Sequence, residues 1–502
     1  MRSCLCAVLA GLLVLAPSAR AQNLPNQDDS SLRRYGVDTA PTQTQNLPDL
    51  GESSQSALSA ADEREIGESI MREIRRDPEY VEDPEIKSYI QALGNRLASA
   101  APVSGRHFEF FVLRNHEVNA FALPGGYIGV HTGLILTTQS ESELASVLAH
   151  ELGHQVQHHM ARMVDKQNQL QILSMAGLAL AILAASANPE LGQAAAITSQ
   201  AAPLQASLSY SRDFEREADR VGFQILSDAG FDVHAMPAFF ERLQRAVRLN
   251  EDNAPAYLHT HPLTTERIAD MQNRVLNTRY QQVRDSVDYG LVRAKIRAET
   301  GTTDQSVAFF RDALHDRRFS NEGTVHYGYA EALVRAKEFD LAAAEVKAAR
   351  RAGLQDPMLE TLAARVQSEA GDRNGAIAVL AAARSQYPVN LGVAYAYAEA
   401  LLSADRAREA LDILTPLTKR VSDDPKVYEL QARAYADLGK RAEQHRALAE
   451  MYLLKAGLPA AIEQLRLAQQ AGDADFYVLS AVDARLRELQ QQRKTELKNR
   501  NR

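Results

Sequence analysis

The chain has 502 residues, of which 45% are hydrophobic and 24% are charged, and its formal net charge is -8. This length predicts at least two domains with large hydrophobic cores. The charge is mildly acidic and no stretch forms a basic stripe, which excludes the electrostatic pattern of a nucleic-acid-binding protein.

The first 21 residues have the pattern of a secretory signal peptide. A short basic start is followed by an apolar run from Cys4 to Ala16, which is too short to span a bilayer comfortably as a membrane anchor. Ala19-Arg-Ala21 fits a cleavage site, so we expect the mature chain to begin near Gln22. Both cysteines lie in this segment, so a mature chain would have no disulfide and no thiol nucleophile.

The next segments predict a leader and then a mixed helical and stranded region. Residues 22–57 are rich in Gln, Asn, Asp, Ser, Pro and Thr without apolar periodicity, which predicts a flexible leader. Helical patterns begin near Ser59. Arg106 to Val112 has strand composition, and a second strand pair, residues 117–122 and 127–131, flanks the turn Leu123-Pro-Gly-Gly126.

A predicted helix from Ser140 to His159 carries the motif His150-Glu-Leu-Gly-His154. Ser140 and Glu143 have capping-box spacing, and leucine and valine recur every four residues along a buried stripe. The two histidines are one turn apart and can bind one ion from the same helix face. Glu151 beside them can take a proton from a metal-bound water, as in zinc peptidases. A histidine-rich amphipathic helix without a metal is the alternative.

A second predicted helix supplies the third ligand that a catalytic zinc ion needs. A metzincin would have glycine at position 157 and histidine at position 160, whereas this chain has Gln157 and Met160. We assign Glu215 as the third ligand and Asp219, four residues later on the same face, as the carboxylate that orients a ligand histidine or the substrate and takes part in catalysis. Ser211 is the expected N-cap. The alternative is a solvated charged helix face.

Between these two helices lies an apolar run of 16 residues, Ile172 to Ala187. It falls short of the roughly 20 residues that cross the hydrocarbon of a bilayer. We expect a buried helix of the protein core. A peripheral contact of residues 172–187 with a membrane is the second hypothesis.

The second half of the chain is rich in alanine and repeats a helical pattern. Tyr329-Ala-Glu-Ala-Leu333 recurs as Tyr397-Ala-Glu-Ala-Leu401, 68 residues later, which is about twice the 34-residue tetratricopeptide period. We predict four or five repeats between residues 279 and 492, followed by a frayed basic tail, residues 493–502. Such arrays bind peptides or proteins on a concave face. A non-repetitive helical domain is the alternative.

Four linked motifs in the peptidase half resemble metallopeptidase family forty-eight, and the closest likeness is to its soluble periplasmic branch. They are His150–His154, Glu215–Asp219, Asn119–Gly126 and Gly129–Gly133. The resemblance implies a mainly α protein that binds one zinc ion per chain. A gluzincin-type α+β zinc metallopeptidase domain with a small edge sheet, residues 58–278, would precede an α-helical tetratricopeptide-repeat superhelix, residues 279–492.

The resemblance also implies roles for residues outside the ligand set. His261, in Thr260-His-Pro262, corresponds to a histidine that can occupy the fourth metal position and hold the enzyme inactive. Tyr127, Gly129 and His131 would lie on an edge strand that accepts the substrate as an added β-strand. From the alternation along this strand, we expect the His131 ring itself to be packed.

The function implied by the resemblance is that of a periplasmic zinc metalloendopeptidase with chaperone-like activity. It would act on misfolded or stalled outer-membrane β-barrel proteins in a Gram-negative bacterium, and the repeats would contact the barrel-assembly machinery. The alternative is mainly a repeat-based chaperone or scaffold with a normally closed protease site. A membrane-embedded prenyl-protein protease fails for lack of spanning helices.

Overall fold

The computed structural model describes residues 59–102, 106–166, 212–249, 255–276, 278–279, 282–455 and 457–500. The predicted signal peptide and leader, the apolar run 172–187 and Ser211 lie outside the described residues, so the predictions made for them stay untested. Among the described residues, no helix has both the length and the apolar character required to cross a membrane.

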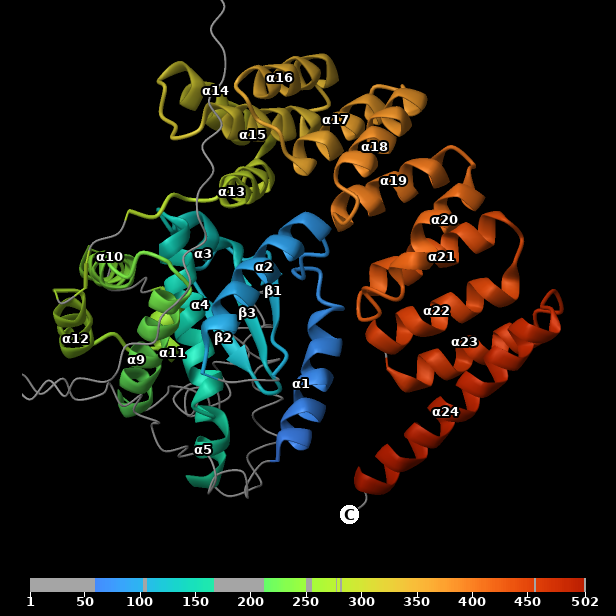
Figure 1. Ribbon diagram of the computed structural model, residues 1–502, viewed down its shortest axis with the longest axis horizontal. Coiled ribbons are helices and arrows are strands. Elements are labelled where there is room, and N and C mark those ends of the chain that lie inside the picture. The colour runs from blue at the N-terminus through green and yellow to red at the C-terminus, as the bar shows by residue number, and fades with distance from the viewer. Residues whose placement is uncertain are drawn as a thin grey trace, which may run out of the picture. The chain divides into compact units, whose positions relative to one another are not determined.

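A three-stranded sheet lies between helices on its two faces (Figure 1). Its strands are β1 (Glu109–Leu113), β2 (Ala120–Leu123) and β3 (Tyr127–His131), in the order β1-β3-β2. β3 pairs in parallel with β1 and antiparallel with β2. The strand predictions are confirmed, but the expectation that Tyr127 to His131 forms an edge strand is wrong, because this strand is bonded on both sides.

Alternation along the strands assigns the two faces of the sheet to different helices. Phe111 and Leu123 pack against α1 (Ala60–Ile74). Phe110 and Ile128 join the larger core of α2 (Pro84–Ala100) and the helices that follow. Successive strand residues point to opposite faces, so five-residue strands are long enough to build both contacts.

The central helix of the peptidase half is α4 (Glu141–Val156), preceded by α3 (Thr132–Thr137) and followed by α5 (His159–Lys166). Ser140 caps α4, since its hydroxyl accepts a hydrogen bond from the Glu143 N–H at 3.2 Å. The second half of the predicted capping box is absent, because the Glu143 carboxylate accepts from the Gln139 N–H at 2.6 Å and pairs with Arg242 instead.

Helix α9 (Arg212–Asp228) crosses α4 at close range, and small residues make this approach feasible. A Cβ atom added to Gly153 would lie 2.7 Å from the Ala218 carbonyl oxygen, and one added to Gly222 would lie 2.9 Å from that of Ala149. Both backbones therefore meet without intervening side chains. The half is completed by α10 (Ala235–Leu249), α11 (Ala256–Thr260) and α12 (Thr265–Leu276).

The remainder of the described chain is a series of helix pairs. Successive first helices begin at Val287, Glu322, Pro357, Leu391, Pro425 and Leu458, which gives a period of 33 to 35 residues. The pairs are α13 (Val287–Glu299) with α14 (Thr303–His315), α15 (Glu322–Arg335) with α16 (Phe339–Arg351), α17 (Pro357–Glu369) with α18 (Arg373–Gln386), α19 (Leu391–Ser403) with α20 (Ala407–Leu417), α21 (Pro425–Asp437) with α22 (Arg441–Lys455), and α23 (Leu458–Gln470) with α24 (Phe476–Arg500).

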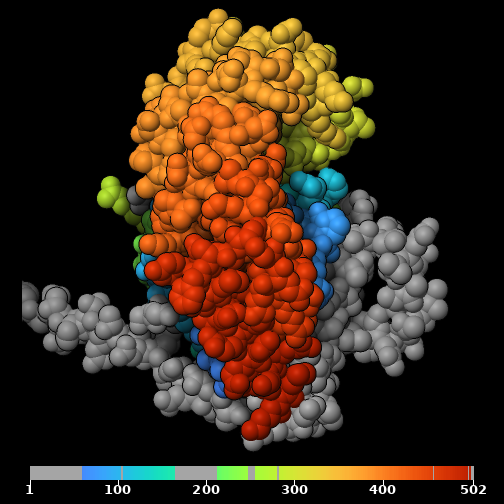
Figure 2. Space-filling model, turned by 90° about the vertical axis from the view of Figure 1, so that its right-hand side faces the viewer, coloured from blue at the N-terminus to red at the C-terminus, as the bar shows by residue number. Residues whose placement is uncertain are grey.

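Two expectations about this array need correction. Six pairs follow the period within residues 287–500, more than the four or five repeats predicted. Helix α24 continues to Arg500, so the basic tail is not frayed from residue 493. No glycine or proline interrupts residues 493–500, and lysine, arginine and glutamate are good helix formers. Figure 2 shows the surface of the later helices, coloured orange to red.

Candidate metal centre

Four buried side chains from three segments converge on one point. His150 and His154 come from α4, Glu215 from α9, and His261 from the residue that ends α11. One ligand atom from each lies within 4.8 Å of the other three, and each residue is at most 2% exposed. The structure therefore brings together the three predicted ligands and the predicted fourth one.

The spacing of the ligand atoms fits a single cation. The Nε2 atoms of His150 and His154 are 3.0 Å apart, and the Glu215 carboxylate lies 3.5 and 3.4 Å from them. His261 Nδ1 lies 3.1 Å from Glu215 Oε1. Three imidazole nitrogens and one carboxylate oxygen form a donor set that suits a divalent transition metal in tetrahedral geometry.

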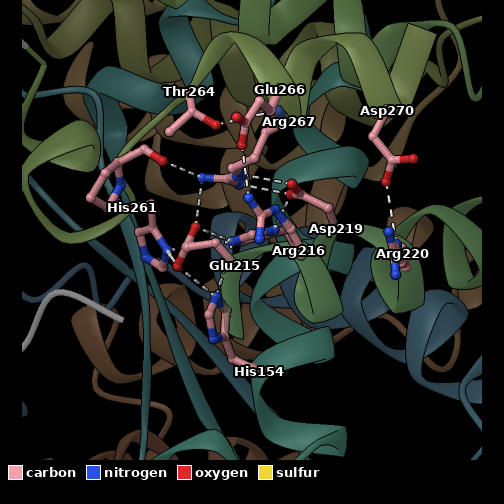
Figure 3. A network of polar contacts seen from close by, with 12 residues as sticks. His154, Glu215, Arg216, Asp219, Arg220, His261, Thr264, Glu266, Arg267 and Asp270 are labelled. Atoms are coloured by element: carbon pink, nitrogen blue, oxygen red, sulfur yellow. Dashed lines mark hydrogen bonds and ion pairs between the residues drawn. The ribbon is translucent and has the colours of Figure 1, made fainter. Parts of the chain in front are cut away.

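A buried ion-pair network joins Arg267 to Glu215 and Asp219 of α9 (Figure 3). His150 Nδ1 lies 2.9 Å from an oxygen of Asp219, as expected for a carboxylate that orients a ligand histidine. Arg267 donates to both oxygens of Asp219, at 2.6 and 2.7 Å, and lies 2.7 Å from Glu215 Oε2. It also donates to the Pro262 carbonyl at 2.8 Å, so it connects the loop of His261 to Glu215 and Asp219.

Sequence reasoning missed Arg267, although a signal was present. The helix it belongs to buries Ile268 and Met271, and a residue four positions before Met271 lies on the same apolar face. A charged residue on a buried face indicates an ion-pair partner inside the protein.

His159 supports the second ligand in the same way and was also missed. Its Nδ1 lies 2.9 Å from the His154 Nδ1, and its Nε2 lies 2.9 Å from the Glu217 carboxylate. The ring stacks on Phe214 at a centroid distance of 4.5 Å. Each histidine of α4 thus has a fixed orientation before any metal binds.

The carboxylates of the site differ in their electrostatic surroundings. Burial opposes ionisation of Glu215, but the neighbouring imidazoles, His261 first, hold the pKa of Glu215 well below its usual value. Burial likewise opposes ionisation of Asp219, yet Arg267 lowers the pKa of Asp219. By contrast, burial raises the pKa of Glu151, which accepts no hydrogen bond within the described residues. Its nearest basic group is His261 Nε2 at 3.5 Å.

The residues predicted to bind substrate lie on the central strand of the sheet and not on an edge strand. Tyr127, Gly129 and His131 are on the central strand β3, whose backbone is already paired on both sides. The His131 ring is packed edge-to-face on Phe121 at 6.0 Å, and burial lowers the pKa of His131 to about 4. Among the described residues, the strand next to α4 with one unpaired edge is β2, and Gln155 of α4 donates to its Leu123 carbonyl at 2.8 Å.

In comparison with known proteins, different family models match the two halves of the chain. The model of "Peptidase family M48" matches residues 84–275, and that of "Tetratricopeptide repeat" matches residues 368–434. The chain is 33% identical over 449 residues to the beta-barrel assembly-enhancing protease of Escherichia coli (strain K12), covering 89% of this chain and 91% of that protein. It is 31% identical over 481 residues to the protein of that name from Yersinia pestis, covering 92% and 96%.

Proposed function

The chain belongs to peptidase family M48, and we propose that it is a periplasmic zinc metalloendopeptidase acting on misfolded or stalled outer-membrane β-barrel proteins. The relatives that match nearly the whole chain are named for barrel assembly. The observation that carries the proposal is the convergence of His150, His154 and Glu215 beside the buried carboxylate of Glu151. One zinc ion per chain fits this donor set.

Each residue of the site has a distinct task in peptide hydrolysis. Zinc, when bound, polarises the scissile carbonyl and makes water a better nucleophile at neutral pH. Glu151 takes the proton of the attacking water and delivers it to the departing amine nitrogen. Asp219 holds the ring of His150 in the orientation that presents Nε2 to the metal, and Arg267 keeps Asp219 ionised and in place.

His261 gives the metal centre four protein ligand atoms, which corresponds to a closed site. Its Nδ1 is as near to the other ligand atoms as they are to each other, at 3.1 Å from Glu215 and 3.4 Å from His150. A fourth protein ligand is typical of structural zinc sites, whereas catalytic sites keep one position for water or substrate. We infer that His261 inhibits the peptidase in this state. This closed geometry also favours the second candidate function, a repeat-based chaperone or scaffold that cleaves only when the site opens.

The extended substrate would pair with the free edge of β2, in place of the strand first expected. β2 packs beside α4, so a strand added to its outer edge would run past the metal ligands. Backbone pairing recognises extended chain rather than a particular sequence, which suits unfolded barrel segments. The helix pairs from α13 onward would contact the barrel-assembly machinery, as repeat arrays bind protein partners.

The test compares the wild-type chain with Glu151→Gln, loaded with zinc, in degradation of casein and of an unfolded barrel protein. The variant keeps all three proposed ligands, so we expect an equal zinc content and a loss of cleavage of at least about 100-fold. Equal cleavage by both proteins would contradict the assignment of Glu151. Full rescue of a barrel-assembly defect by Glu151→Gln would favour the chaperone function.

A further inference from the structure

The buried hydroxyl of Tyr257, in the short helix α11, has no partner in the part of the chain that the structure describes. The residue is 2% exposed, and within the described residues its hydroxyl makes no hydrogen bond. A buried polar group that lacks a hydrogen bond costs stability, so native proteins contain few of them. Such a group in a polar site indicates a hydrogen bond that is made only to a bound molecule.

The hydroxyl belongs to the catalytic half of the site. The ring of Tyr257 stacks on His261 at a centroid distance of 4.6 Å and meets His150 edge-on at 6.3 Å. Of the charged groups around it, the carboxylates of Glu151 and then Glu215 act most strongly on the phenol. Tyr257 therefore lies beside both the proposed general base and the proposed metal ligands.

Other donors near this point are already engaged. Arg267 directs its guanidinium nitrogens at Asp219, Glu215 and the Pro262 carbonyl. His261 is within 3.1 Å of Glu215. A substrate carbonyl that enters the site therefore finds the phenol as a neutral donor that does not have to break a bond within the protein.

We propose that Tyr257 is a catalytic residue whose hydroxyl donates a hydrogen bond to the scissile carbonyl oxygen as this oxygen becomes negative. The proposal rests on the proposed peptidase function. In the first step the water oxygen bonds to the carbonyl carbon, the carbonyl π electrons move onto the oxygen, and Glu151 receives the proton of the water. In the second step the carbonyl re-forms, the carbon–nitrogen bond breaks, and Glu151 gives the proton to the amine. Tyr257 stays protonated throughout and stabilises the charge.

The backbone of α11 allows Tyr257 to stay in place when His261 leaves. The Tyr257 N–H donates to the Val118 carbonyl at 3.1 Å, next to the start of β2, so the beginning of α11 is anchored to the sheet segment. His261 lies at the other end of α11, where its N–H donates to the Tyr257 carbonyl at 2.9 Å. Rotation of the chain after residue 257 would free the metal position without removing the phenol.

The experiment uses zinc-loaded full-length protein and the variant Tyr257→Phe, which removes only the hydroxyl. Tyr289→Phe is the matched control, because that buried hydroxyl donates to the Thr138 carbonyl at 3.1 Å, far from the ligands in sequence. Three properties are measured: kcat and KM on an unfolded peptide, zinc content, and the Kd values of two inhibitors. A phosphinic peptide mimics the tetrahedral oxyanion, and a peptide hydroxamate binds zinc without that geometry.

For Tyr257→Phe we expect kcat to fall about 100-fold or more with KM changed less than about threefold, since one oxyanion donor has this effect in other hydrolases. The phosphinic peptide should lose affinity by a similar factor. Zinc content, hydroxamate affinity and Tm should stay as in the wild type. Tyr289→Phe should show the reverse pattern, a lower Tm with unchanged kcat, because it loses a hydrogen bond outside the site.

Two outcomes would overturn the proposal while leaving the peptidase intact. One is a kcat of Tyr257→Phe within about threefold of the wild type. The other is an equal loss of both inhibitors or of zinc, which would show that Tyr257 only supports the structure. If neither the wild type nor the variant cleaves peptide and neither binds the hydroxamate, the proposed function itself fails, and the role of Tyr257 fails with it.

Discussion

The buried carboxylates around the metal ligands carry more negative charge than the buried arginine beside them can offset. Glu151, Glu215 and Asp219 are each at most 1% exposed, and the buried Arg267 pairs with Glu215 and Asp219. Three ionised carboxylates against one guanidinium would leave an excess of two negative charges. Protons can offset part of this excess, because burial raises the pKa of Glu151 and, although burial opposes it, Asp219 and Glu215 raise the pKa of His150 to about 9. Uncompensated buried charge is strongly unfavourable, so a bound dication would take the place of these protons. A bound dication would therefore favour the ionised form of Glu151, which can accept a proton.

Replacing His261 with alanine should raise peptidase activity. In the proposed closed state the imidazole occupies the position that water or substrate needs, and the other three proposed ligands remain after its removal. We expect cleavage of casein by His261→Ala to rise about tenfold or more, which corresponds to removal of a bias of at least about 1.4 kcal/mol toward the closed state. His259→Ala is the control, because His259 is an exposed residue of the same helix. Equal activity of the two variants would exclude the inhibitory role.

At the scale of single elements, the N-cap residue of helix α17 is Asp356, whose carboxylate lies near those of Asp288 and Glu85. Asp356 caps the helix by accepting from the Met358 N–H at 2.8 Å. It is 7% exposed, and burial together with Asp288 and Glu85 raises the pKa of Asp356 to about 6. The native state therefore holds this proton up to about pH 6, whereas the unfolded chain releases it near pH 4. This contribution to stability is complete below about pH 4 and is lost as the pH rises through about 6.

Substituting Asp356 with asparagine should therefore stabilise the protein at neutral pH. The amide oxygen can still cap α17, and it has no charge to place beside Asp288. We expect the free energy of unfolding to rise by about 1–3 kcal/mol at pH 7.5 and to change little at pH 4, as measured by urea denaturation. Asp372→Asn, which changes the exposed cap of α18 in the same way, is the control for the cap itself. An Asp356→Asn gain that is equal at both pH values would contradict the explanation.

The elements that sequence reasoning predicted well are those specified by local periodicity. One helical turn between His150 and His154 already determines that both rings share a face, and the capping residue Ser140 marks where the helix begins. The repeats were recognised from their period although the chain contains no tryptophan. These features depend on residues a few positions apart, so the sequence expresses them directly.

The features that could not be predicted depend on pairing between distant segments. Three short strands can be ordered in more than one way, and their composition does not tell which strand, β2 or β3, is central. The contacts of Arg267 with Asp219 and of His159 with Glu217 join helices more than 45 residues apart. Tyr257 was missed because its proposed role depends on a hydroxyl that makes no hydrogen bond among the described residues, and a sequence does not show this.

At the scale of the whole molecule, the main hydrophobic core does not end at the predicted domain boundary near residue 278. One continuous cluster of buried residues extends from Val81 to Val366, and it includes helices of the first repeats as well as the peptidase half. Later repeats have smaller clusters of their own, from Ile377 to Ala434 and from Ala449 to Leu489. In repeat arrays, the free energy of unfolding is roughly the sum of the stabilities of the single repeats and of the interfaces between neighbouring repeats. The division at residues 278 and 279 therefore stays a prediction about sequence families rather than about cooperative units.

Removing the metal should destabilise the large core and leave the late repeats unchanged. A ligand that binds only the native state stabilises it by about 4 kcal/mol at 1,000 times its Kd, and this corresponds to a Tm shift of roughly 7 °C for a unit of almost 300 residues. We expect two calorimetric transitions, of which only the one that reports the cluster Val81 to Val366 falls when a chelator is added. In His150→Ala, which lacks a ligand, the chelator should move neither transition. A single transition that shifts as a whole would show that the repeats and the metal centre unfold together, because the stabilisation would then be shared across every pair of helices up to α24.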